Sequence, residues 1–270
     1  MDKNTYDKGM SLYDEGKFVE SSRYLLECLD CTDSLFELKV GNLFLNGYGV
    51  EQDYSKAFEW FLKSAEQGNM LAMMNIGSLY FNGYGVEKSY RNAFEWYSKS
   101  AQLGHVDAYL AIADMCYEGI GLEQSYEKAF EIYMMVANVG VPEAQYHVAI
   151  MYQSGEGVEQ SNEEAFKWFL KAAEGGDQLA QIDVGGFYYD GIVVQQSYEE
   201  AFKWFLKSAQ QDNPDAQINV GAMYLFGRGV EQSYANAYFW LKQALDNGDE
   251  RAEDLIKRIP EEYKNNSSIA

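Results

Sequence analysis

The chain has 270 residues, of which 47% are hydrophobic and 16% aromatic, a composition that excludes an intrinsically disordered protein. Twenty-one Lys and Arg residues stand against 42 Asp and Glu residues, so the formal net charge is −21. A field of that sign repels phosphate backbones and anionic lipid headgroups, which argues against nucleic-acid and membrane partners.

The compartment is predicted from two features. The start of the chain has no apolar signal region, and the most apolar stretch, residues 132–141, is far shorter than the ~20 residues of a membrane span. Cys28, Cys31 and Cys116 are an odd, sparse set that does not suit a disulfide framework. We therefore expect a soluble cytoplasmic protein; an export signal removed from the start would leave no trace here.

Residues 1–33 predict a short helix pair joined by a tight turn at Asp14–Lys17, suited to an N-terminal cap. The Cys28-x-x-Cys31 motif lies at the end of this pair. It has no second cysteine pair for a four-ligand zinc site and no βαβ context for a redox site. We interpret these cysteines as incidental helical thiols.

A glycine loop, Gly-x-Gly-Val or a close variant, then returns every 36 residues. An alanine follows its first glycine by ten residues and an aromatic residue by eleven. Self-similarity at this period predicts a solenoid of stacked units and overrides a domain count based on length. The first glycines are Gly47, Gly83, Gly119, Gly155, Gly191 and Gly227, and the units are 34–69, 70–105, 106–141, 142–177, 178–213 and 214–249.

Each unit predicts two helices, the first ending at the loop glycine and the second starting at a capping residue. Ser161 with Glu164, and Ser197 with Glu200, also fit the capping box. The predicted N-caps of the second helices are Asp53, Ser89, Ser125, Ser161, Ser197 and Ser233. Glycines suited to the left-handed C′ position follow these helices at Gly68, Gly104, Gly140, Gly176 and Gly248.

Small residues on the first helices predict close packing of the second helix, against Ala57 and its equivalents. We assign these small residues, the alanines and the recurrent tryptophans to packing between helices. The small residues are Gly41, Gly77, Ala113, Ala149, Gly185 and Gly221. The pattern thus predicts an all-α fold, a right-handed α-α superhelix of antiparallel helix pairs.

Residues 250–270 predict a C-terminal capping helix and tail. A lone polar helix is expected from Glu250 to about Ile259, where Pro260 stops it. A frayed tail with Asn265, Asn266 and Ser267 follows; this formal glycosylation acceptor is treated as incidental.

The motif Gly77-x-x-Tyr80-x-x-Gly83-Tyr84-Gly85-Val86, followed by Ala93-Phe94-x-Trp96-Tyr97 and Ala101-x-x-Gly104, resembles the SEL-one-like repeat (SLR). The resemblance covers residues 34–249 and implies a tetratricopeptide-like α-solenoid. Members of the family serve as adaptors and scaffolds, among them regulators, host-interaction proteins and immunity proteins against toxins. The regular cysteine pairs of the secreted branch are absent here, so the disulfides and activities of that branch are not carried over.

Val193 departs from the repeat, because it replaces the second loop glycine. A β-branched residue with positive φ would cost ~1–2 kcal/mol. We therefore expect the loop Gly191–Val194 to adopt a different backbone.

Catalytic and cofactor sites are not indicated. His105 and His147 lie in different units at different positions, and the glycine loops lack the Lys-Ser/Thr of a phosphate-binding loop. No metal or cofactor is predicted, and a hydrolase is an alternative without a supporting motif.

Partner recognition should use positions of the first helices where the units differ, on the inner face of the stack. These positions would form a trough of aromatic residues with acidic edges, as protein interfaces do. Alternatively, the aromatics simply cover neighbouring turns. The candidate residues are Ser78, Phe81, Asn82, Asp114, Tyr117, Glu118, Ile150, Gln153, Tyr189 and Asp190.

The function predicted from these features is a non-enzymatic scaffold or adaptor that binds a protein or peptide in its concave face. Its acidity favours a basic partner. An immunity protein that neutralises a basic bacterial toxin is the alternative, and a monomer is favoured over self-assembly. The partner itself is left open by the sequence.

Overall fold

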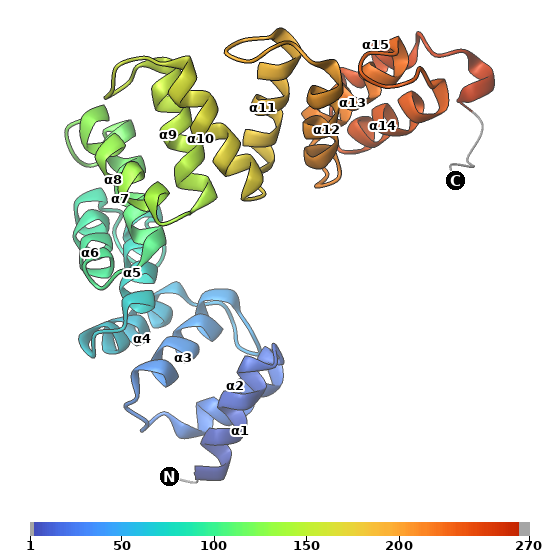
Figure 1. Cartoon of the computed structure of the whole chain (residues 1–270). Coiled ribbons are helices and arrows are strands. Elements are labelled where there is room, and N and C mark those ends of the chain that lie inside the picture. Colours follow the sequence, from blue (N-terminus) through green and yellow to red (C-terminus); the bar gives the residue numbers. More distant parts are fainter. Residues whose placement is uncertain (1–2, 265–270) are drawn as a thin grey trace. The chain divides into compact units, whose positions relative to one another are not determined.

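The computed structural model describes residues 3–264, which form helices and loops with no β-strand (Figure 1). Two short 3₁₀ helices, η1 (Leu26–Cys28) and η2 (Glu261–Tyr263), lie near the ends. The α-helices are α1 (Lys3–Asp14), α2 (Phe18–Leu25), α3 (Ser34–Asn46), α4 (Tyr54–Glu66), α5 (Met70–Asn82), α6 (Tyr90–Gln102), α7 (Val106–Glu118), α8 (Tyr126–Asn138), α9 (Pro142–Ser154), α10 (Asn162–Glu174), α11 (Gln178–Asp190), α12 (Tyr198–Ala209), α13 (Pro214–Phe226), α14 (Tyr234–Asp246) and α15 (Ala252–Ile256).

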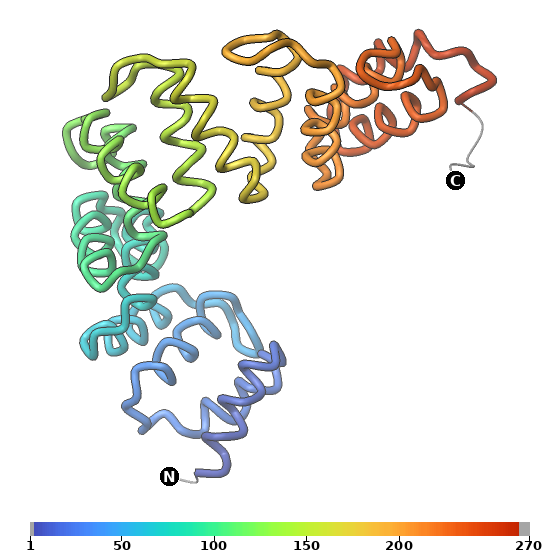
Figure 2. Tube along the Cα trace, in the orientation of Figure 1, coloured from blue at the N-terminus to red at the C-terminus, as the bar shows by residue number. Residues whose placement is uncertain are grey.

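The chain divides into two compact units, residues 1–132 and 133–270, with the boundary inside α8. Within each unit, a helix packs most extensively on the next one along the chain, and each pair then packs on its neighbour. The trace in Figure 2 shows these pairs, for example α9 with α10 and α13 with α14. The predicted all-α fold of consecutive helix pairs is confirmed.

The predicted ends of the helices are confirmed by their local hydrogen bonds. Each of the six N-cap side chains accepts a backbone N–H three residues later, at 3.0–3.3 Å. The six glycines that begin the loops have φ between 64° and 79°, a left-handed conformation that glycine adopts without strain. Local chemistry therefore fixes where most helices start and stop.

A capping box predicts two hydrogen bonds, and only one of them forms. The Ser161 hydroxyl accepts the Glu164 N–H, but the Glu164 side chain does not accept the Ser161 N–H. The backbone N–H of Ser161 donates to the carbonyl of Tyr152 at 2.9 Å, because the loop folds back onto the preceding helix. The N–H is thus already satisfied, and the Glu164 side chain instead accepts from Lys167 at 2.6 Å. In the same way, the Ser197 N–H donates to the carbonyl of Tyr188, and the Glu200 side chain accepts from Lys203.

A glutamine in five of the six loops fastens the end of the first helix. Its side-chain amide donates to a carbonyl in the last turn, at 2.7–2.8 Å, which satisfies one acceptor that the helix leaves open. The glutamines are Gln52, Gln124, Gln160, Gln196 and Gln232, and their acceptors are Leu45, Tyr117, Gln153, Tyr189 and Leu225. These bonds hold in place the turn that carries several candidate residues.

The glycines of the first helices face large side chains of the second helix and not chiefly the alanines, which corrects the predicted contact; the side chain is aromatic at three of them and Leu241 at Gly221. A Cβ added at Gly77 would lie 2.5 Å from the ring of Tyr97, and one at Gly185 would lie 2.5 Å from Phe205. Each ring belongs to the residue four positions after the recurrent alanine. Glycine is thus required because the second helix presents a large side chain at the closest approach.

The tryptophans of the second helices are covered by lysines. In four repeats, a lysine three residues later places its Nζ 3.6–3.8 Å from the ring centroid of the tryptophan. The pairs are Trp60 with Lys63, Trp96 with Lys99, Trp168 with Lys171 and Trp204 with Lys207. Cation–π contact and burial of the lysine stem both support a packing role for this column.

The predicted change of backbone at Val193 is wrong. Val193 has φ 66°, close to Gly157 at 71° and Gly229 at 68°. The loop is held on both sides, since Gly191 ends α11 in the left-handed conformation and the Gln196 side chain bonds to the same helix. The repeat therefore imposes its backbone on a residue that is unfavourable there.

Both ends of the repeat array carry short helices. The N-terminal pair α1 and α2 is joined by a turn with Gly16 at φ 74°, as predicted. The C-terminal helix α15 is shorter than expected, because Arg251 is held in a turn in which its N–H donates to the Asp249 carboxylate at 3.0 Å. Pro260 is followed by η2, and the predicted tail from Asn265 lies outside the described residues.

Candidate partner-binding site

Three adjoining cavities lie along the first helices of the unit 133–270, between α9, α11 and α13. Their volumes are about 400, 290 and 330 Å³. The first and second share Gly186, Asp190, Phe205 and Asn219, and the second and third share Ile182, Asp183 and Asn219. We call this set of cavities the α11–α13 groove.

Helical spacing explains why these residues gather in one place. On α11, Asp183, Gly186 and Asp190 follow one another by three and four residues and lie on one face. On α13, Asn219, Ala222 and Phe226 have the same spacing. A Cβ at Gly186 would meet nothing within 4 Å, so this residue leaves the groove open.

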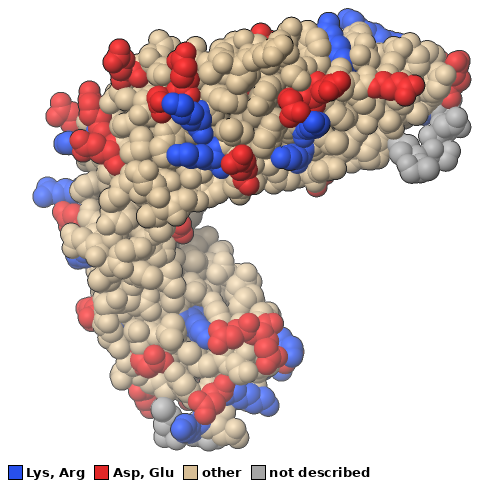
Figure 3. Space-filling model, in the orientation of Figure 1, with Lys and Arg blue, Asp and Glu red and all other residues tan. Residues whose placement is uncertain are grey.

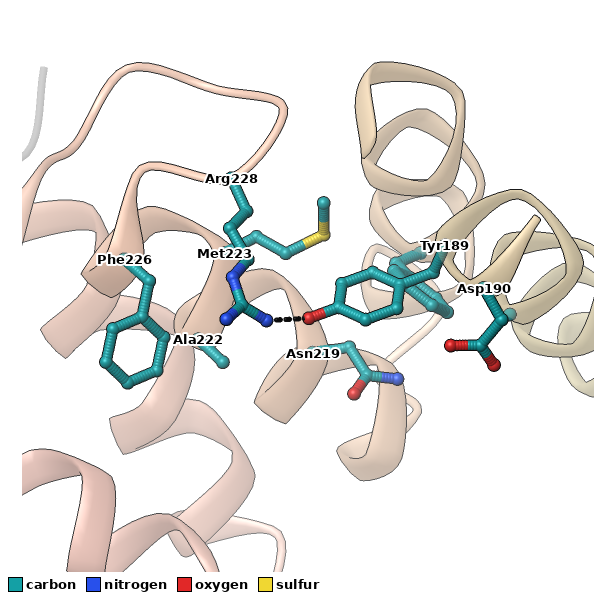
Figure 4. Close-up of a pocket in the computed structure, with 9 residues that line it drawn as sticks. Tyr189, Asp190, Asn219, Ala222, Met223, Phe226 and Arg228 are labelled. Atoms are coloured by element: carbon teal, nitrogen blue, oxygen red, sulfur yellow. Dashed lines mark hydrogen bonds between the residues drawn. The ribbon is translucent and has the colours of Figure 1, made fainter. Parts of the chain in front are cut away.

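One wall of the groove is formed by Tyr189 and Arg228, which reach toward each other from α11 and from the loop after α13 (Figure 4). The Arg228 guanidinium donates a hydrogen bond to the Tyr189 hydroxyl. It also lies 5.8 Å from the ring centroids of both Tyr189 and Phe226. A cation and two aromatic faces therefore line the first cavity of the groove.

Asp183, Asp190 and Asn219 are polar groove residues whose side chains make no hydrogen bond or ion pair with any described residue. Asp183 and Asn219 occupy equivalent positions in successive repeats, eight residues before the first loop glycine, and we call such a set of equivalent positions a column. Other polar residues of this column do have partners. Lys39 donates to Asp14 at 2.6 Å, and Asn75 donates to Asn42 at 3.4 Å. The hydrogen-bonding capacity of the groove is thus available to a ligand.

Burial, and after it the negative charge of Asp177, raise the pKa of the Asp183 carboxyl to about 6. Tyr146, which lines the same cavity, has its pKa raised to about 12 by burial and by these two aspartates. Arg251 also lines this cavity, but its guanidinium binds Asp215 and Asp249. Asp183 is therefore a largely desolvated carboxylate without a compensating cation.

The groove lies where the fourth repeat departs from the others. Three repeats place an aromatic residue near the end of the first helix in edge contact with the tyrosine that starts the second, at centroid distances of 4.9–5.1 Å. In the fourth repeat this pair is Gln153 and Asn162, and both residues line the second cavity. Smaller amide side chains thus replace two rings beside Asp183.

The aromatic candidates predicted from the sequence all make structural contacts. Each packs edge-to-face on a tyrosine of the same repeat, as in the alternative interpretation that they cover neighbouring turns. The pairs are Phe81 with Tyr90, Tyr117 with Tyr126 and Tyr189 with Tyr198. Of the three, Tyr189 also lines a cavity of the α11–α13 groove.

The polar candidates of the unit 1–132 are engaged mainly within their own helix and repeat. The Ser78 hydroxyl donates to the carbonyl of Met74 at 3.2 Å, and Asn82 donates to the carbonyl of Ser78 at 2.9 Å. Asp114 and Glu118 are exposed on α7. Their role in binding stays a prediction.

The candidates of the unit 133–270 are partly brought together. Gln153 and Asp190 line the second cavity, and Tyr189 and Asp190 line the first. Ile150 is half-buried and lines none of the three cavities. Four of the ten predicted positions thus lie in this unit, and three of them line the groove.

The sequence interpretation missed Asp183, Asn219 and Arg228. Asp183 and Asn219 lie eight residues before the first loop glycine, one helical turn before the position of the candidates Ser78, Asp114 and Ile150. This column varies as strongly as any other, since it reads Lys39, Asn75, Ala111, His147, Asp183 and Asn219. This variability is the signal in the sequence that points to Asp183 and Asn219.

Other chemistry-bearing residues do not form a second site. Cys28 and Cys31 are buried thiols without a disulfide, and burial together with the neighbouring Cys28 raises the pKa of Cys31. His147 stacks on Tyr133 with a centroid distance of 4.5 Å. Within residues 3–264, no cluster of three His, Cys, Asp or Glu side chains could hold a metal, and no helix is long and apolar enough to cross a membrane.

Comparison with solved structures reveals related repeat proteins. A Sel1 repeat protein from Oxalobacter formigenes has 27% identity and a TM-score of 0.82, covering 89% of this chain and 99% of that one. A protective antigen of uropathogenic Escherichia coli with an SLR fold has 28% identity and a TM-score of 0.76, covering 93% of this chain. The chain spans only 55% of the length of that antigen.

The family assignment comes from the repeats themselves. No curated protein matches the chain. The Sel1 repeat model matches residues 35–69, 71–105, 106–133, 142–177, 178–213 and 214–249. Proteins of this kind are generally protein-interaction scaffolds. The chain therefore belongs to the Sel1 repeat family.

Proposed function

We propose that the protein is an interaction scaffold that binds a segment of a partner protein in the α11–α13 groove. The observation that carries this proposal is the set of unpartnered polar side chains, Asp183, Asp190 and Asn219, around adjoining cavities. Asp183 and Asn219 are half-buried, and Asp190 is exposed at the edge. Half-buried polar groups without partners favour the complex, because a ligand supplies the missing hydrogen bonds. Aromatic side chains beside them offer apolar contact area.

A basic partner is favoured by the charge of the protein. The formal net charge is −21, and Figure 3 shows Asp and Glu side chains interspersed with fewer Lys and Arg side chains on the visible face. Electrostatic attraction should accelerate association at low salt. Association that is insensitive to ionic strength would contradict this part of the proposal. An immunity role is the special case in which the basic partner is a bacterial toxin, and rescue of growth on co-expression tests it.

Binding accounts for the groove better than hydrolysis does. Asp183, with a pKa of about 6, is the kind of group that acid–base catalysis uses. Tyr146, which lines the same cavity, has a pKa raised to about 12 and is therefore a protonated hydrogen-bond donor at neutral pH. A carboxylate next to a phenol donor and apolar walls suits recognition of a polar group.

The proposal is tested with a variant that fills the groove without disturbing the framework. Gly186→Leu adds a side chain where a Cβ has open space, whereas Glu199→Leu places the same side chain at an exposed position of α12. Partners captured from native lysate are purified, and their affinity is measured by calorimetry. Gly186→Leu is expected to weaken binding at least about tenfold. Equal affinity for the wild type and both variants would exclude the groove.

A further inference from the structure

The column that contains Asp183 shows how this position differs from its equivalents. Lys39 and Asn75 find partners inside the protein, and His147 stacks on Tyr133. Asp183 lines the second and third cavities and pairs with no described residue. A framework residue would be expected to satisfy its charge internally, as Lys39 does. Asp183 does not.

The surroundings of Asp183 have the chemistry of a site for an aliphatic chain that ends in a cation. Ile182, Phe187 and Phe205 supply apolar walls. Asn219 and Asp190 add amide and carboxylate oxygens as further acceptors. A lysine or arginine stem packs on apolar surface while its charged end seeks carboxylate partners.

The cations already present in the groove do not neutralise Asp183. Arg251 lines the third cavity, but its guanidinium is bound to Asp249, with Nε 2.9 Å from one carboxylate oxygen, and to Asp215. Arg228 lines the first cavity and donates to the Tyr189 hydroxyl. Arg251 is thus already paired with two carboxylates, and Arg228 lines a cavity that Asp183 does not line.

The space beside Asp183 results from residues that break the repeat. Gln153 and Asn162 stand where three other repeats have an aromatic pair, and Gly186 leaves the cavity open. Val193 replaces the loop glycine of the next repeat, and its equivalent Gly229 approaches the residue that corresponds to Asn162. Gln153, Asn162 and Gly186 all line the second cavity, so these three departures from the repeat converge on one cavity.

We propose that Asp183 forms the subsite for a lysine or arginine side chain of the bound segment, an inference that rests on the proposed function. The carboxylate pairs with the ammonium or guanidinium group, Asn219 accepts a further hydrogen bond, and the aliphatic stem lies against Phe205 and Ile182. The pairing compensates the desolvation of Asp183, which a neutral side chain would leave uncompensated. The groove therefore selects for a basic residue at one position of its partner.

Capped pentapeptides with a central Lys, Arg, Gln or Glu between two leucines are suitable probes. They are titrated into the full-length ¹⁵N-labelled protein, and backbone amide shifts give both the site and the dissociation constant. The Lys and Arg peptides are expected to bind at least about fivefold more tightly than the Gln peptide, with shifts in residues 182–190 and 219–226. Glu should bind most weakly.

Variants separate this inference from the proposed function. In Asp183→Asn, the affinity of the Lys and Arg peptides is expected to fall to that of the Gln peptide. Asp212→Asn removes the same charge from an exposed loop and should leave the preference intact. Equal binding of Lys and Gln peptides in the groove would overturn the subsite and leave the scaffold proposal standing. A preference that survives Asp183→Asn would also overturn the subsite.

Two further outcomes are decisive. Binding of all four peptides that is unaffected by Gly186→Leu would exclude the groove and with it the scaffold proposal, as would the absence of any shift in the groove. Spermidine carries the same ammonium groups without the leucines. If spermidine shifts the same amides at least as strongly as the Lys peptide, the subsite belongs to a free amine and not to a protein segment.

Discussion

Val193 has the same left-handed backbone as Gly229, with φ values of 66° and 68°. The two positions are equivalent in successive repeats but differ in what lies opposite. A Cβ at Gly229 would lie 2.2 Å from the carbonyl oxygen of Tyr198, whereas Val193 is accommodated and 43% exposed. Asn162 stands in the fourth repeat where the fifth has Tyr198. The framework therefore accepts a side chain in one of the two loops.

The same exchange at these two loops should have opposite consequences. Val193→Gly relieves a left-handed valine but adds freedom to the unfolded chain, so we expect a change of less than ~1 kcal/mol, toward greater stability. Gly229→Val introduces both the strain and a clash with Tyr198, and should cost at least ~2 kcal/mol. Urea denaturation followed by circular dichroism measures both. A large loss of stability in Val193→Gly would show that the valine contributes packing that outweighs its strain.

Gly185 and Gly186 are neighbours with different requirements. A Cβ at Gly185 would lie 2.5 Å from the Phe205 ring, but one at Gly186 would meet nothing within 4 Å. Gly185→Ala is expected to destabilise the protein by ~1–3 kcal/mol, and Gly186→Ala to stabilise it by ~0.5–1 kcal/mol through helix propensity. Thermal unfolding of the two variants, prepared in parallel, compares them directly. Equal destabilisation by both would mean that Gly186 is also a packing glycine.

Features governed by neighbouring residues were predictable from the sequence. Ser161 caps α10 and Gly191 ends α11 because the side-chain oxygen and the left-handed glycine act within one turn of the chain. The period of 36 residues then extends each local prediction to every repeat. The order and pairing of the helices follow from these two facts.

Features that depend on tertiary surroundings were not predictable. Whether Asp183 has a partner depends on what α9, α13 and the Arg251 turn place next to it. The backbone of Val193 depends on a balance between ~1–2 kcal/mol of local strain and the bonds that hold both ends of the loop. Tyr189 could be interpreted as a binding residue or as a packing residue, and the structure shows that it contacts Tyr198 while also lining a cavity.

Tyr189→Phe separates the two contacts of this residue. The ring packing on Tyr198 is retained, while the hydrogen bond from Arg228 is lost. The exposed position of that bond suggests a stability change of less than ~1 kcal/mol. Because the released Arg228 guanidinium can then turn into the cavity, we expect weaker binding of a basic segment, measured by calorimetry.

Tyr189→Ala is the comparison, since loss of the ring should also destabilise the repeat by ~1–3 kcal/mol. Unchanged affinity in Tyr189→Phe would show that Arg228 and its contact with Tyr189 are not part of the binding site.

Asp183 should make the stability of the protein depend on pH in an unusual direction. Burial raises its pKa to about 6, so between roughly pH 4 and pH 6 the folded chain retains a proton that the unfolded chain has lost. The contribution of this carboxyl to stability therefore falls as the pH rises through this window, and its destabilising effect is complete above it. The charges near Asp183 include Asp177, which caps its own helix, and Asp215 and Arg251 from neighbouring elements.

Asp183→Asn removes this titration while keeping the shape of the side chain. At pH 7.5 the variant is expected to be more stable than the wild type by ~1–2 kcal/mol, after allowance for partial solvent screening, and the difference should vanish near pH 4. Urea denaturation at a series of pH values measures it, with Asp212→Asn as the exposed control. A stability difference between variant and wild type that is constant with pH would contradict a raised pKa for the Asp183 carboxyl. The gain in stability, together with the loss of lysine binding, would identify Asp183 as a residue retained for recognition at the expense of the fold.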